Sequence, residues 1–360
     1  MRIAFVLCGD LASVSGGFLY DRQLIGGLRA AGAVVDVVSL PWWRSYGEAL
    51  AANLMPWPFE AADYDVIVQD QLCHAGVFLR NAGLRRTKRV PVISLVHNLT
   101  STQPRTRRRG WVRACERAYF DSVDGVIAVC GGTLDDVRAL RAQRWTSTAP
   151  LLASPGADHV PALPTDLVAK RGREDRPLRL LNIGLVAPHK GVHRLLPILS
   201  QVEGVTLDVA GGLTAARDYV RHVRREIAHR GLSDRVTLHG QLDPDALANL
   251  RAGCDVFVMP SDREAYPIAA LEGFAAGLPA LLTDQGGTAE VIGGSAAGRL
   301  LPPDDEAAWA AAITSLARDR QSLSTLAHAA LARHAAHVTW GETARRVHAW
   351  LGAVTRGSAN

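Results

Sequence analysis

Several features that would assign a protein to a class are missing from this sequence. No run of eighteen apolar residues occurs, so no membrane-spanning helix is predicted. No two cysteines form a CxxC pair, and the five present lie in apolar segments, at positions 8, 73, 115, 130 and 254. We therefore expect buried, reduced thiols rather than a zinc site or disulfides. No GxGxxG fingerprint follows the first predicted strand, so a nicotinamide cofactor is unsupported.

The chain also lacks any extreme of composition. Hydrophobic residues make up 48% and charged residues 21% of its 360 residues, which is ordinary for a globular protein. This length predicts two domains or one large one. The first apolar run, Ile3–Cys8, is too short for a signal-peptide core and is typical of a first strand. We expect a cytoplasmic protein.

Short apolar runs recur along the chain and predict parallel β-strands. Each is rich in Val, Ile and Leu without polar alternation, which is typical of strands buried on both faces of a sheet. Helical patterns separate them, for example at Tyr20–Ala31, Asp218–Arg230 and Ile268–Ala276, and the residues from Glu306 onward also look helical. The predicted strands are Arg2–Cys8, Val34–Leu40, Asp65–Gln69, Val90–Val96, Gly125–Val129, Arg179–Ile183, Thr206–Ala210, Val236–His239, Val256–Met259 and Ala280–Thr283.

A stretch with little periodicity separates the two series of strands. Residues 159–177 carry several prolines and charges and are interpreted as an interdomain linker. We therefore expect two doubly wound α/β domains, residues 1–165 and 166–336, with a C-terminal helix in residues 337–360 that packs back on the first domain. Ligands of such sheets bind at the carboxyl ends of the strands, and two domains in series favour a cleft between them.

Basic residues exceed acidic ones by five, and many of them gather in two short segments. The first holds Arg85, Arg86, Lys88 and Arg89, and the second holds Arg105, Arg107, Arg108, Arg109 and Arg113. The second leads into an amphipathic stretch with Trp111. One hypothesis is a face for anionic lipid head groups, at the inner face of a membrane, or for a phosphorylated acceptor. The alternative is an ordinary solvated surface. No nucleic-acid-binding motif accompanies it, so no such partner is expected.

Two glutamates separated by seven residues carry the richest chemistry in the sequence. Glu264 follows a predicted strand, and Glu272 lies two turns further on, in a predicted helix. Pro267 suits the first helical turn, where its missing N–H costs nothing, and the amides around it would face a ligand at the positive end of the helix dipole. A carboxylate at Glu272 could accept from the vicinal hydroxyls of a ribose. The alternative is a helix N-terminus that acidic residues simply favour.

This segment resembles the E-x7-E signature of the retaining GT-B glycosyltransferases of family 4. Segments 277–279 and 283–290 resemble the same family, and the resemblance covers nearly the whole chain. It implies two Rossmann-like domains facing a cleft, and metal-independent transfer of a hexosyl group from a UDP- or GDP-linked sugar. It also implies that Glu264 contacts donor-sugar hydroxyls and that Glu272 holds the ribose. The sugar-holding backbone would here belong to Ala265, Tyr266, Pro267 and Ile268, of which Pro267 has no N–H to give.

Segment 184–191 resembles the phosphate clamp of that family. Gly184 makes a turn after a strand, and Lys190 stands before a helix, which favours binding of a diphosphate. The alternative is a surface lysine near a helix start. The family pairs the lysine with an arginine, but Leu185 stands in that place and removes a fixed positive charge. Another arginine, or the neighbouring His189, could substitute, or donor handling is weakened.

Three further segments match positions that contact the donor in this family. Gly16 and Gly17, in the loop after the first strand, would lie over the phosphates, although such glycine turns are common. His97, at the end of a strand, would contact the 6-position of the donor sugar, although a lone histidine is more often structural. Gly240 and Leu242 match the backbone positions that meet the nucleobase.

The resemblance assigns catalysis to His97, Glu264 and Lys190, and no metal or cofactor is expected. Asp63 and Asp65 have the spacing of a metal-binding DxD motif but precede a strand in the first domain. The rival functions are an inverting transferase or an epimerase of the same fold, and a non-catalytic subunit that binds a sugar nucleotide. The acceptor could be a lipid, a glycan or a small molecule. The sequence does not separate a monomer from a homodimer.

Overall fold

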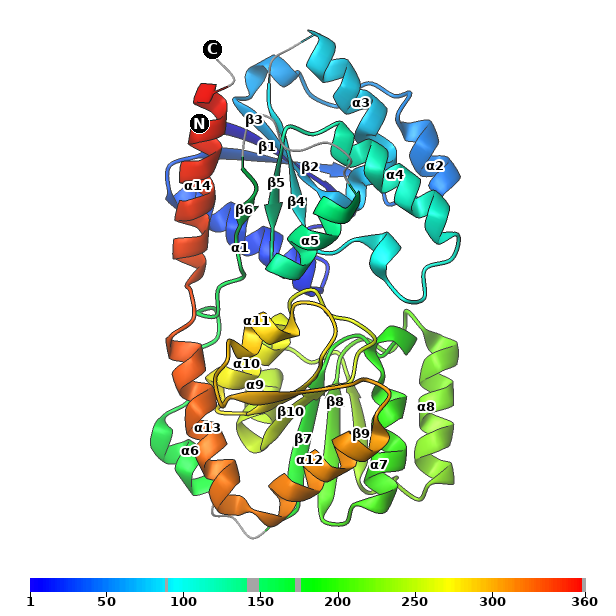
Figure 1. Cartoon of the computed structure of the whole chain (residues 1–360), viewed down its shortest axis with the longest axis vertical. Helices are drawn as coiled ribbons and strands as arrows, with labels where there is room; N and C mark the ends of the chain where they lie inside the picture. The colour runs from blue at the N-terminus through cyan, green and yellow to red at the C-terminus, as the bar shows by residue number, and fades with distance from the viewer. Residues whose placement is uncertain (88–89, 141–148, 172–175, 358–360) are drawn as a thin grey trace. The chain divides into compact units, whose positions relative to one another are not determined.

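The computed structural model describes residues 1–87, 90–140, 149–171 and 176–357 (Figure 1). The chain divides into two compact units. Unit 1 comprises Met1–Gly156 and Val338–Asn360, and unit 2 comprises Ala157–His337. The boundary therefore lies at residues 156 and 157 and not at residues 165 and 166, where the sequence places it. Each unit is a parallel sheet covered by helices.

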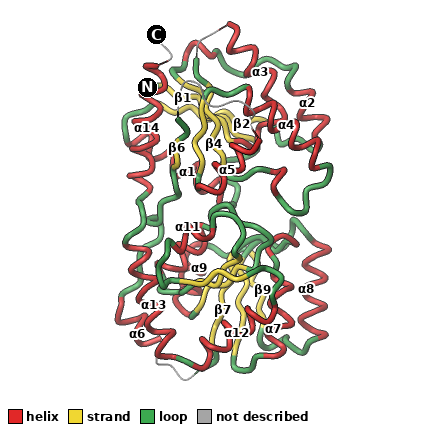
Figure 2. Tube along the Cα trace, in the orientation of Figure 1, coloured by secondary structure: helices red, strands yellow, loops and turns green. Residues whose placement is uncertain are grey.

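Unit 1 contains a six-stranded parallel sheet with the order β2-β1-β3-β4-β5-β6 among the described residues (Figure 2). The five strands expected in this half of the chain are present. The sixth, β6, has two residues and so leaves no periodic pattern to read. The strands are β1 (Arg2–Cys8), β2 (Val34–Leu40), β3 (Val66–Asp70), β4 (Val92–Val96), β5 (Gly125–Ala128) and β6 (Leu151–Leu152).

Helices cover both faces of this sheet. On one face a core cluster joins Val6 of β1 to Val77 of α3 and to Tyr119 and Phe120 of α4. The last helix, α14, packs along α1, where the Tyr20 and Trp340 rings meet edge to face at 5.2 Å. The helices of unit 1 are α1 (Gly16–Ala30), α2 (Tyr46–Ala52), α3 (His74–Thr87), α4 (Arg109–Asp121), α5 (Gly131–Leu140) and α14 (Trp340–Gly357).

Unit 2 contains a second six-stranded parallel sheet, with the order β12-β11-β10-β7-β8-β9. Alternate residues of β10 enter different core clusters: Val256 and Val258 one, Phe257 and Met259 the other. This is why its sequence is apolar throughout. The strands are β7 (Leu178–Ile183), β8 (Val205–Ala210), β9 (Val236–Gly240), β10 (Val256–Met259), β11 (Ala280–Thr283) and β12 (Gly298–Leu301).

The helices of unit 2 pack on both faces of its sheet. Trp309 of α12 joins the cluster that contains Val256, and Phe274 of α10 joins the cluster that contains Phe257. The helices are α6 (Thr165–Arg171), α7 (Leu195–Gln201), α8 (Arg217–His229), α9 (Pro244–Gly253), α10 (Ile268–Ala275), α11 (Thr288–Ile292), α12 (Glu306–Arg318) and α13 (Arg320–Ala335).

The linker predicted at residues 159–177 is wrong. Part of it folds as α6, whose Val168 is buried against Ala327 and Leu331 of α13. The helix is short and its apolar side is narrow, so its prolines and charges dominate the sequence pattern. The helix predicted from Tyr20 also begins earlier, at Gly16, because Ser15 caps it by accepting a hydrogen bond from Phe18 N.

Two further expectations concern membranes and thiols. Among the helices of the described segments, none is both long enough and apolar enough to cross a membrane. All five cysteines are buried free thiols, as expected from their apolar surroundings. Two of them, Cys8 and Cys73, lie with their sulfur atoms 3.0 Å apart.

Candidate active site

Glu264 lies in the loop between β10 and α10, and a second loop holds its backbone. Glu264 N donates to Gln285 O at 3.2 Å, and Gly287 N donates to Glu264 O at 2.9 Å. Gly286 has a φ of +90°, and a β-carbon there would stand 1.9 Å from Glu264 O. The sequence 285–287 therefore allows two loops to lie against each other, and it fixes the carboxylate of Glu264 at the carboxyl edge of the sheet.

Lys190 ends a turn that follows β7, and its side chain reaches Glu264. The Nζ atom lies 2.6 Å from Glu264 Oε1, and the two side chains are 23% and 11% exposed. Gly191 permits the close approach of the two segments, because a β-carbon there would stand 2.0 Å from Pro260 O. Asp262 N also donates to His189 O. Two residues singled out from separate motifs thus form one charged pair.

Glu272 lies on α10 and is held by two cationic or polar partners that the sequence motifs did not indicate. Arg251 Nη1 donates to its Oε2 at 2.7 Å, and His159 Nε2 lies 3.0 Å from its Oε1. The Glu272 side chain is 13% exposed. Arg251 lies on α9, which carries none of the sequence motifs, so no sequence signal pointed to it.

The turn between Glu264 and α10 differs from the expected geometry. The helix begins at Ile268, and Pro267 stands just before it with φ −75° and ψ 89°, outside the helical region. The expectation that Pro267 occupies the first helical turn is therefore wrong by one position. Tyr266 Oη lies 3.4 Å from His337 Nε2, within unit 2. Of the expected sugar-holding segment, Ala265, Tyr266 and Pro267 therefore lie between Glu264 and the helix, and Ile268 is the first residue of α10.

The glycines predicted to meet the donor nucleotide, Gly184 and Gly240, lie at the carboxyl ends of two strands of one sheet. Gly184 follows β7 and Gly240 ends β9, and β8 lies between these strands. Gly211 N, after β8, donates to Gly240 O at 2.8 Å. Leu242 lies two residues beyond Gly240. Leu185 is 37% exposed and lies against Gly212, so the side chain that replaces the arginine is at the surface of this edge.

Arg194 does not supply the missing arginine. Its guanidinium donates to Pro260 O at 2.9 Å and lies 2.7 Å from Asp262 Oδ1 and 3.0 Å from Asp304 Oδ1. These contacts tie the turn after β7 to the loop that carries Glu264. The guanidinium is therefore used to hold the loop in place.

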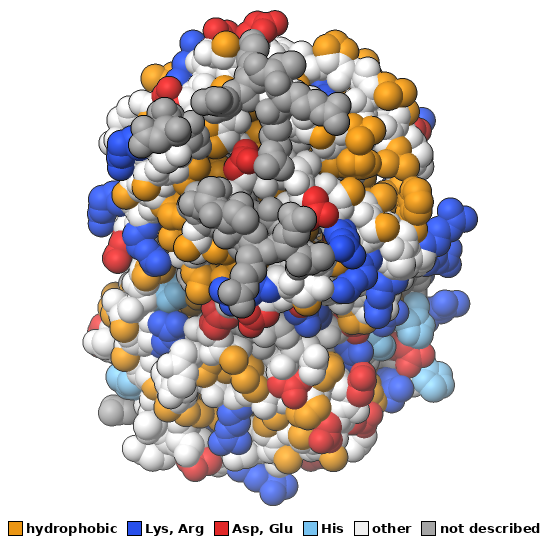
Figure 3. Space-filling model, turned by 45° about the horizontal axis from the view of Figure 1, so that its top comes forward, with side chains coloured by type: hydrophobic (Ala, Val, Ile, Leu, Met, Phe, Trp, Pro, Cys, Tyr) orange, Lys and Arg blue, Asp and Glu red, His pale blue; other side chains and the backbone are white. Residues whose placement is uncertain are grey.

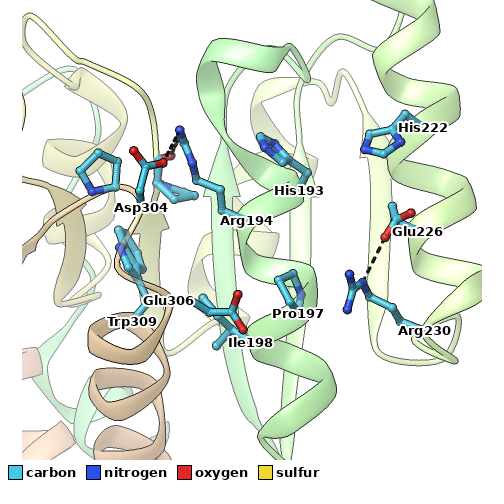
Figure 4. Close-up of a pocket in the computed structure, with 12 residues that line it drawn as sticks. His193, Arg194, Pro197, Ile198, His222, Glu226, Arg230, Asp304, Glu306 and Trp309 are labelled. Atoms are coloured by element: carbon cyan, nitrogen blue, oxygen red, sulfur yellow. Dashed lines mark hydrogen bonds and ion pairs between the residues drawn. The ribbon is translucent and has the colours of Figure 1, made fainter.

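A pocket of about 460 Å³ lies beside Arg194 in unit 2 (Figure 4). Its walls come from segment 193–198, from α8, from Pro260 and from segment 303–309, and His193 and His222 stand at one end of it in the figure. None of the predicted site residues lines it. Lys190 and Glu264, which meet at the carboxyl edge of the sheet, do not line this pocket.

In unit 1, the predicted residues Gly17 and His97 lie together. A β-carbon on Gly17 would stand 3.5 Å from the His97 ring, and Gly16 begins α1. His97 also lies near two buried carboxylates that the motifs did not indicate, since Asp21, Asp70 and His97 bring one oxygen or nitrogen each within 4.8 Å of one another. Sequence signals were present for both carboxylates: Asp21 lies among the buried residues of its predicted helix, and Asp70 directly follows the predicted strand Asp65–Gln69.

The DxD-like pair and the basic segments complete the predicted features. Asp65 accepts from Arg2 N at 2.7 Å, at the amino end of β3 and so at the edge opposite His97. The side chains of the first basic segment, 85–89, lie outside the described residues. In the second segment the five arginines and Trp111 are exposed.

Two family models match the chain. Residues 165–333 match the family described as glycosyl transferases group 1, and residues 15–146 match glycosyltransferase family 4. Sucrose-phosphate synthase from Thermosynechococcus elongatus superposes with a TM-score of 0.79 at 22% identity, over 99% of this chain and 98% of that one. Anabaena HepE, solved in complex with UDP, gives 0.76 at 18% identity over 98% and 100%. The fold is that of a GT-B glycosyltransferase.

Sequence relatives of this GT-B chain agree with the domain matches. D-inositol 3-phosphate glycosyltransferase of Stackebrandtia nassauensis is 31% identical over 202 residues, which is 53% of this chain and 45% of that protein. Glycogen synthase of Mycobacterium tuberculosis is 28% identical over 262 residues, 70% of this chain and 60% of that protein. The match spans less than two thirds of the length of either relative.

Proposed function

We propose that this chain is a retaining, metal-independent glycosyltransferase that moves a hexosyl group from a nucleoside-diphosphate sugar to a hydroxyl-bearing acceptor. The contact between Lys190 and Glu264 carries the proposal. It joins a cation suited to a diphosphate with a carboxylate suited to sugar hydroxyls, at the carboxyl edge of one parallel sheet. The matches to glycosyltransferase domains and the UDP bound by HepE support the same assignment.

Lys190 and Glu264 divide the work at the reacting end of the donor. As the bond between sugar and phosphate breaks, negative charge grows on the diphosphate. A fixed ammonium therefore stabilises the transition state more than it stabilises the ground state. Glu264 accepts hydrogen bonds from sugar hydroxyls. The ion pair keeps both side chains oriented before the donor binds, which lowers the entropy lost on binding. The identity of the donor hexose stays open, because Pro267 has no N–H to donate in the sugar-holding turn.

Glu272 is assigned to the ribose of the donor. A carboxylate can accept about four hydrogen bonds, and Arg251 and His159 use one on each oxygen. The remaining lone pairs suit the two vicinal hydroxyls of a ribose. Arg251 also offsets the charge of Glu272, whose side chain is only 13% exposed. Gly240 and Leu242 meet the base through backbone atoms, which leaves UDP and GDP donors both open.

Unit 1 is assigned to the acceptor, with His97 beside Gly17 at its carboxyl edge. The acceptor oxygen forms its bond to the anomeric carbon on the face from which the diphosphate leaves. The acceptor proton passes to the leaving phosphate oxygen, so the products are the glycoside and the nucleoside diphosphate. This front-face course follows from the resemblance to family 4 enzymes. Water competes with the acceptor, and excluding water from the site would suppress hydrolysis of the donor.

The decisive experiment is a donor panel followed by an acceptor screen. The purified full chain is titrated calorimetrically with UDP, GDP and their hexose conjugates, and then incubated with the donor that binds and with lipid, glycan and small-molecule acceptors. We expect binding of one nucleotide class without added metal, and a mass increase of one hexose on an acceptor with retained anomeric configuration. Absence of any nucleotide binding contradicts the assignment, and an inverted product contradicts the retaining mechanism.

A non-catalytic subunit that binds a sugar nucleotide is the second candidate, and Leu185 favours it. An exposed leucine replaces the bidentate cation that stabilises the leaving diphosphate in the family. Loss of that cation would weaken turnover more than binding, because the charge it meets grows in the transition state. Donor binding without hydrolysis or transfer, across the whole acceptor screen, would favour this candidate over the enzyme.

We further propose that the segment Arg105–Arg113 is a peripheral contact with an anionic membrane. Its five arginines and Trp111 are exposed around the start of α4, while the opposite side of α4 buries Val112, Cys115 and Tyr119. Lys and Arg side chains gather at the right of Figure 3, and both α4 and the Arg-rich α8 lie on that side in Figure 1. Each basic residue near an anionic surface contributes about 1 kcal/mol, and the indole suits the interface.

A further inference from the structure

Three titratable side chains meet at the carboxyl edge of the unit 1 sheet. His97 follows β4, Asp70 ends β3, and Asp21 lies in the second turn of α1. Asp21 and Asp70 are 0% and 1% exposed, whereas the His97 side chain retains 16%. Burying two ionised carboxylates away from water costs free energy, so the neighbouring groups determine whether each carboxylate is charged.

Hydrogen bonds determine which atoms of the trio face each other. His97 Nε2 lies 3.0 Å from Asp21 Oδ1, and Asp70 Oδ1 accepts from Leu72 N at 2.9 Å. Asp21 Oδ2 is buried without a partner among the described residues. An ionised carboxylate only accepts, so His97 Nε2 carries a hydrogen. Within the described chain, His97 Nδ1 has no hydrogen-bond partner of its own.

The charges of the trio are coupled. Desolvation, followed by the negative charge of Asp21, raises the pKa of Asp70 to about 7, so Asp70 is largely protonated just below neutral pH. Burial alone would lower the pKa of His97, but the charge and hydrogen bond of Asp21, together with Asp70, raise it overall. An ionised Asp21, a protonated Asp70 and a protonated His97 together carry no net charge, which is the arrangement that burial favours.

The other groups around the trio do not change this balance. The Tyr20 ring meets His97 edge to face at 5.2 Å, and burial raises the pKa values of Tyr20, Cys73 and Tyr119. All three are therefore neutral at physiological pH. The titratable groups that interact with the trio are Tyr20 on α1, Cys73 after β3 and Tyr119 on α4. Two further groups interact with these neighbours: Cys8 on β1 with Cys73 and Tyr119, and Arg346 on α14 with Tyr20.

We propose that Asp21 is a positioning residue that holds His97 as an imidazolium, so that His97 donates its Nδ1–H to a substrate oxygen and does not act as a base. Asp70 carries the proton that allows Asp21 to remain ionised beside it. The inference rests on the proposed transferase function and deepens it. A protonated His97 cannot take the acceptor proton, which then goes to the leaving phosphate oxygen as the nucleoside diphosphate departs.

The protonation state is tested without any substrate. The full chain is labelled with ¹⁵N-histidine, the His97 signals are assigned by their loss in His97→Gln, and both ring nitrogens are followed from pH 5 to 9. We expect both nitrogens protonated at neutral pH, with titration above the ordinary histidine range. Asp21→Asn should move the titration to lower pH, whereas Asp70→Asn, which imitates the protonated acid, should leave it raised. An ordinary titration in the unmodified chain overturns the inference even if Asp21→Asn fails to fold.

Activity supplies the second readout. With transfer followed from pH 5 to 9, kcat should fall as His97 loses its proton at high pH, and the fall should begin at lower pH in Asp21→Asn with donor KM nearly unchanged. A rise of kcat with pH through the titration of His97 would make it a base and overturn the inference. So would stoichiometric binding of Zn²⁺ or Mn²⁺ that Asp21→Asn abolishes, since the trio would then be a metal site. If the histidine titrates as expected but no transfer occurs, the proposed function fails and the protonation finding stands.

Discussion

Lys190 Nζ lies 2.6 Å from Glu264 Oε1, although the two residues belong to different loops and lie 74 positions apart in the chain. The pair is possible because Gly191 lets its own loop touch Pro260 and Gly286 lets another loop touch Glu264. Three strand ends thus place a cation and an anion at one point. A donor sugar diphosphate needs both kinds of group, one for each of its parts.

Replacement of Lys190 by Met should abolish most of the activity while the fold is kept. The ammonium is lost where charge develops on the leaving group, so kcat should fall by about 10²–10³-fold. The matched control is Arg221→Met, because Arg221 forms an exposed ion pair with Asp218 on α8 of the same unit. Steady-state kinetics and thermal melting check both variants. Equal activity in the two variants would remove Lys190 from the mechanism.

Substitutions of Arg251 and Glu272 should have non-additive effects on the free energy of unfolding, but different effects on nucleotide affinity. Their side chains are 8% and 13% exposed, so removing either partner leaves a poorly solvated charge, at a cost of about 2–4 kcal/mol in the free energy of unfolding. The double variant Arg251→Met with Glu272→Gln should lose less than the sum of the two. Urea unfolding measures this cycle.

Nucleotide affinity distinguishes the two members of the pair. If Glu272 holds the ribose, Glu272→Gln should weaken UDP or GDP binding by about tenfold, because a charged acceptor becomes a neutral one. Arg251→Met should weaken binding less, since Arg251 acts through Glu272. Calorimetric titration gives both constants. Unchanged nucleotide affinity in Glu272→Gln would contradict the ribose assignment.

Local sequence patterns predicted most of the fold. The parallel strands are buried on both faces, so their apolar runs stand out, and Arg2–Cys8, Val34–Leu40, Val256–Met259 and Ala280–Thr283 have the predicted bounds. Helix α6 was missed because one buried residue, Val168, anchors it and the partners of Val168 lie about 160 positions away. Such a helix is specified by long-range packing, which leaves no periodic signal in seven residues.

Site residues were predictable from the sequence where they lie within a single recognisable motif. Glu264, Glu272 and Lys190 stand in recognisable segments, but their partners come from elsewhere in the chain. Arg251 lies 21 positions from Glu272 and Asp21 lies 76 from His97. These pairs depend on which strand ends and helix faces meet in space, so only the folded chain reveals them.

Replacement of Leu185 by Arg should strengthen donor handling. Leu185 is 37% exposed at the edge that carries Lys190, so a guanidinium has room there and can reach a diphosphate bidentately. A charge-assisted contact contributes about 1.5–3 kcal/mol, so donor affinity or kcat should rise by about tenfold or more. The control is Leu185→Gln, which is polar but uncharged. If the arginine variant gains nothing over the glutamine variant, diphosphate recognition in this chain does not use that position.

Asp70 should make the stability of unit 1 depend on pH. Its pKa is raised to about 7 by burial and by Asp21, above the ordinary value of 3.8, so the folded state holds a proton that the unfolded state releases. Stability from this group is therefore complete below about pH 4 and is lost as pH rises through 7. The loss is at most about 4 kcal/mol. Asp70→Asn should remove this pH-dependent loss. In urea unfolding, the free energy of unfolding of the variant should therefore rise relative to that of the unmodified chain between pH 4 and pH 8. A constant difference between the two proteins would show that Asp70 is ionised throughout.

The exposed arginines before α4 should bind anionic membranes. The charge-reversed variant Arg107→Glu with Arg108→Glu should lose binding to vesicles that contain phosphatidylglycerol by about 10²-fold, because four units of charge change near the surface. Its matched control is Arg217→Glu with Arg221→Glu, which makes the same charge change on exposed residues of α8 in unit 2. Trp111→Ala should weaken binding further at high salt, where the contribution of the charges is screened and that of the indole remains. Flotation of the full chain with neutral and anionic vesicles measures all of these. If the two charge-reversed variants lose binding equally, the effect belongs to net charge and not to this face.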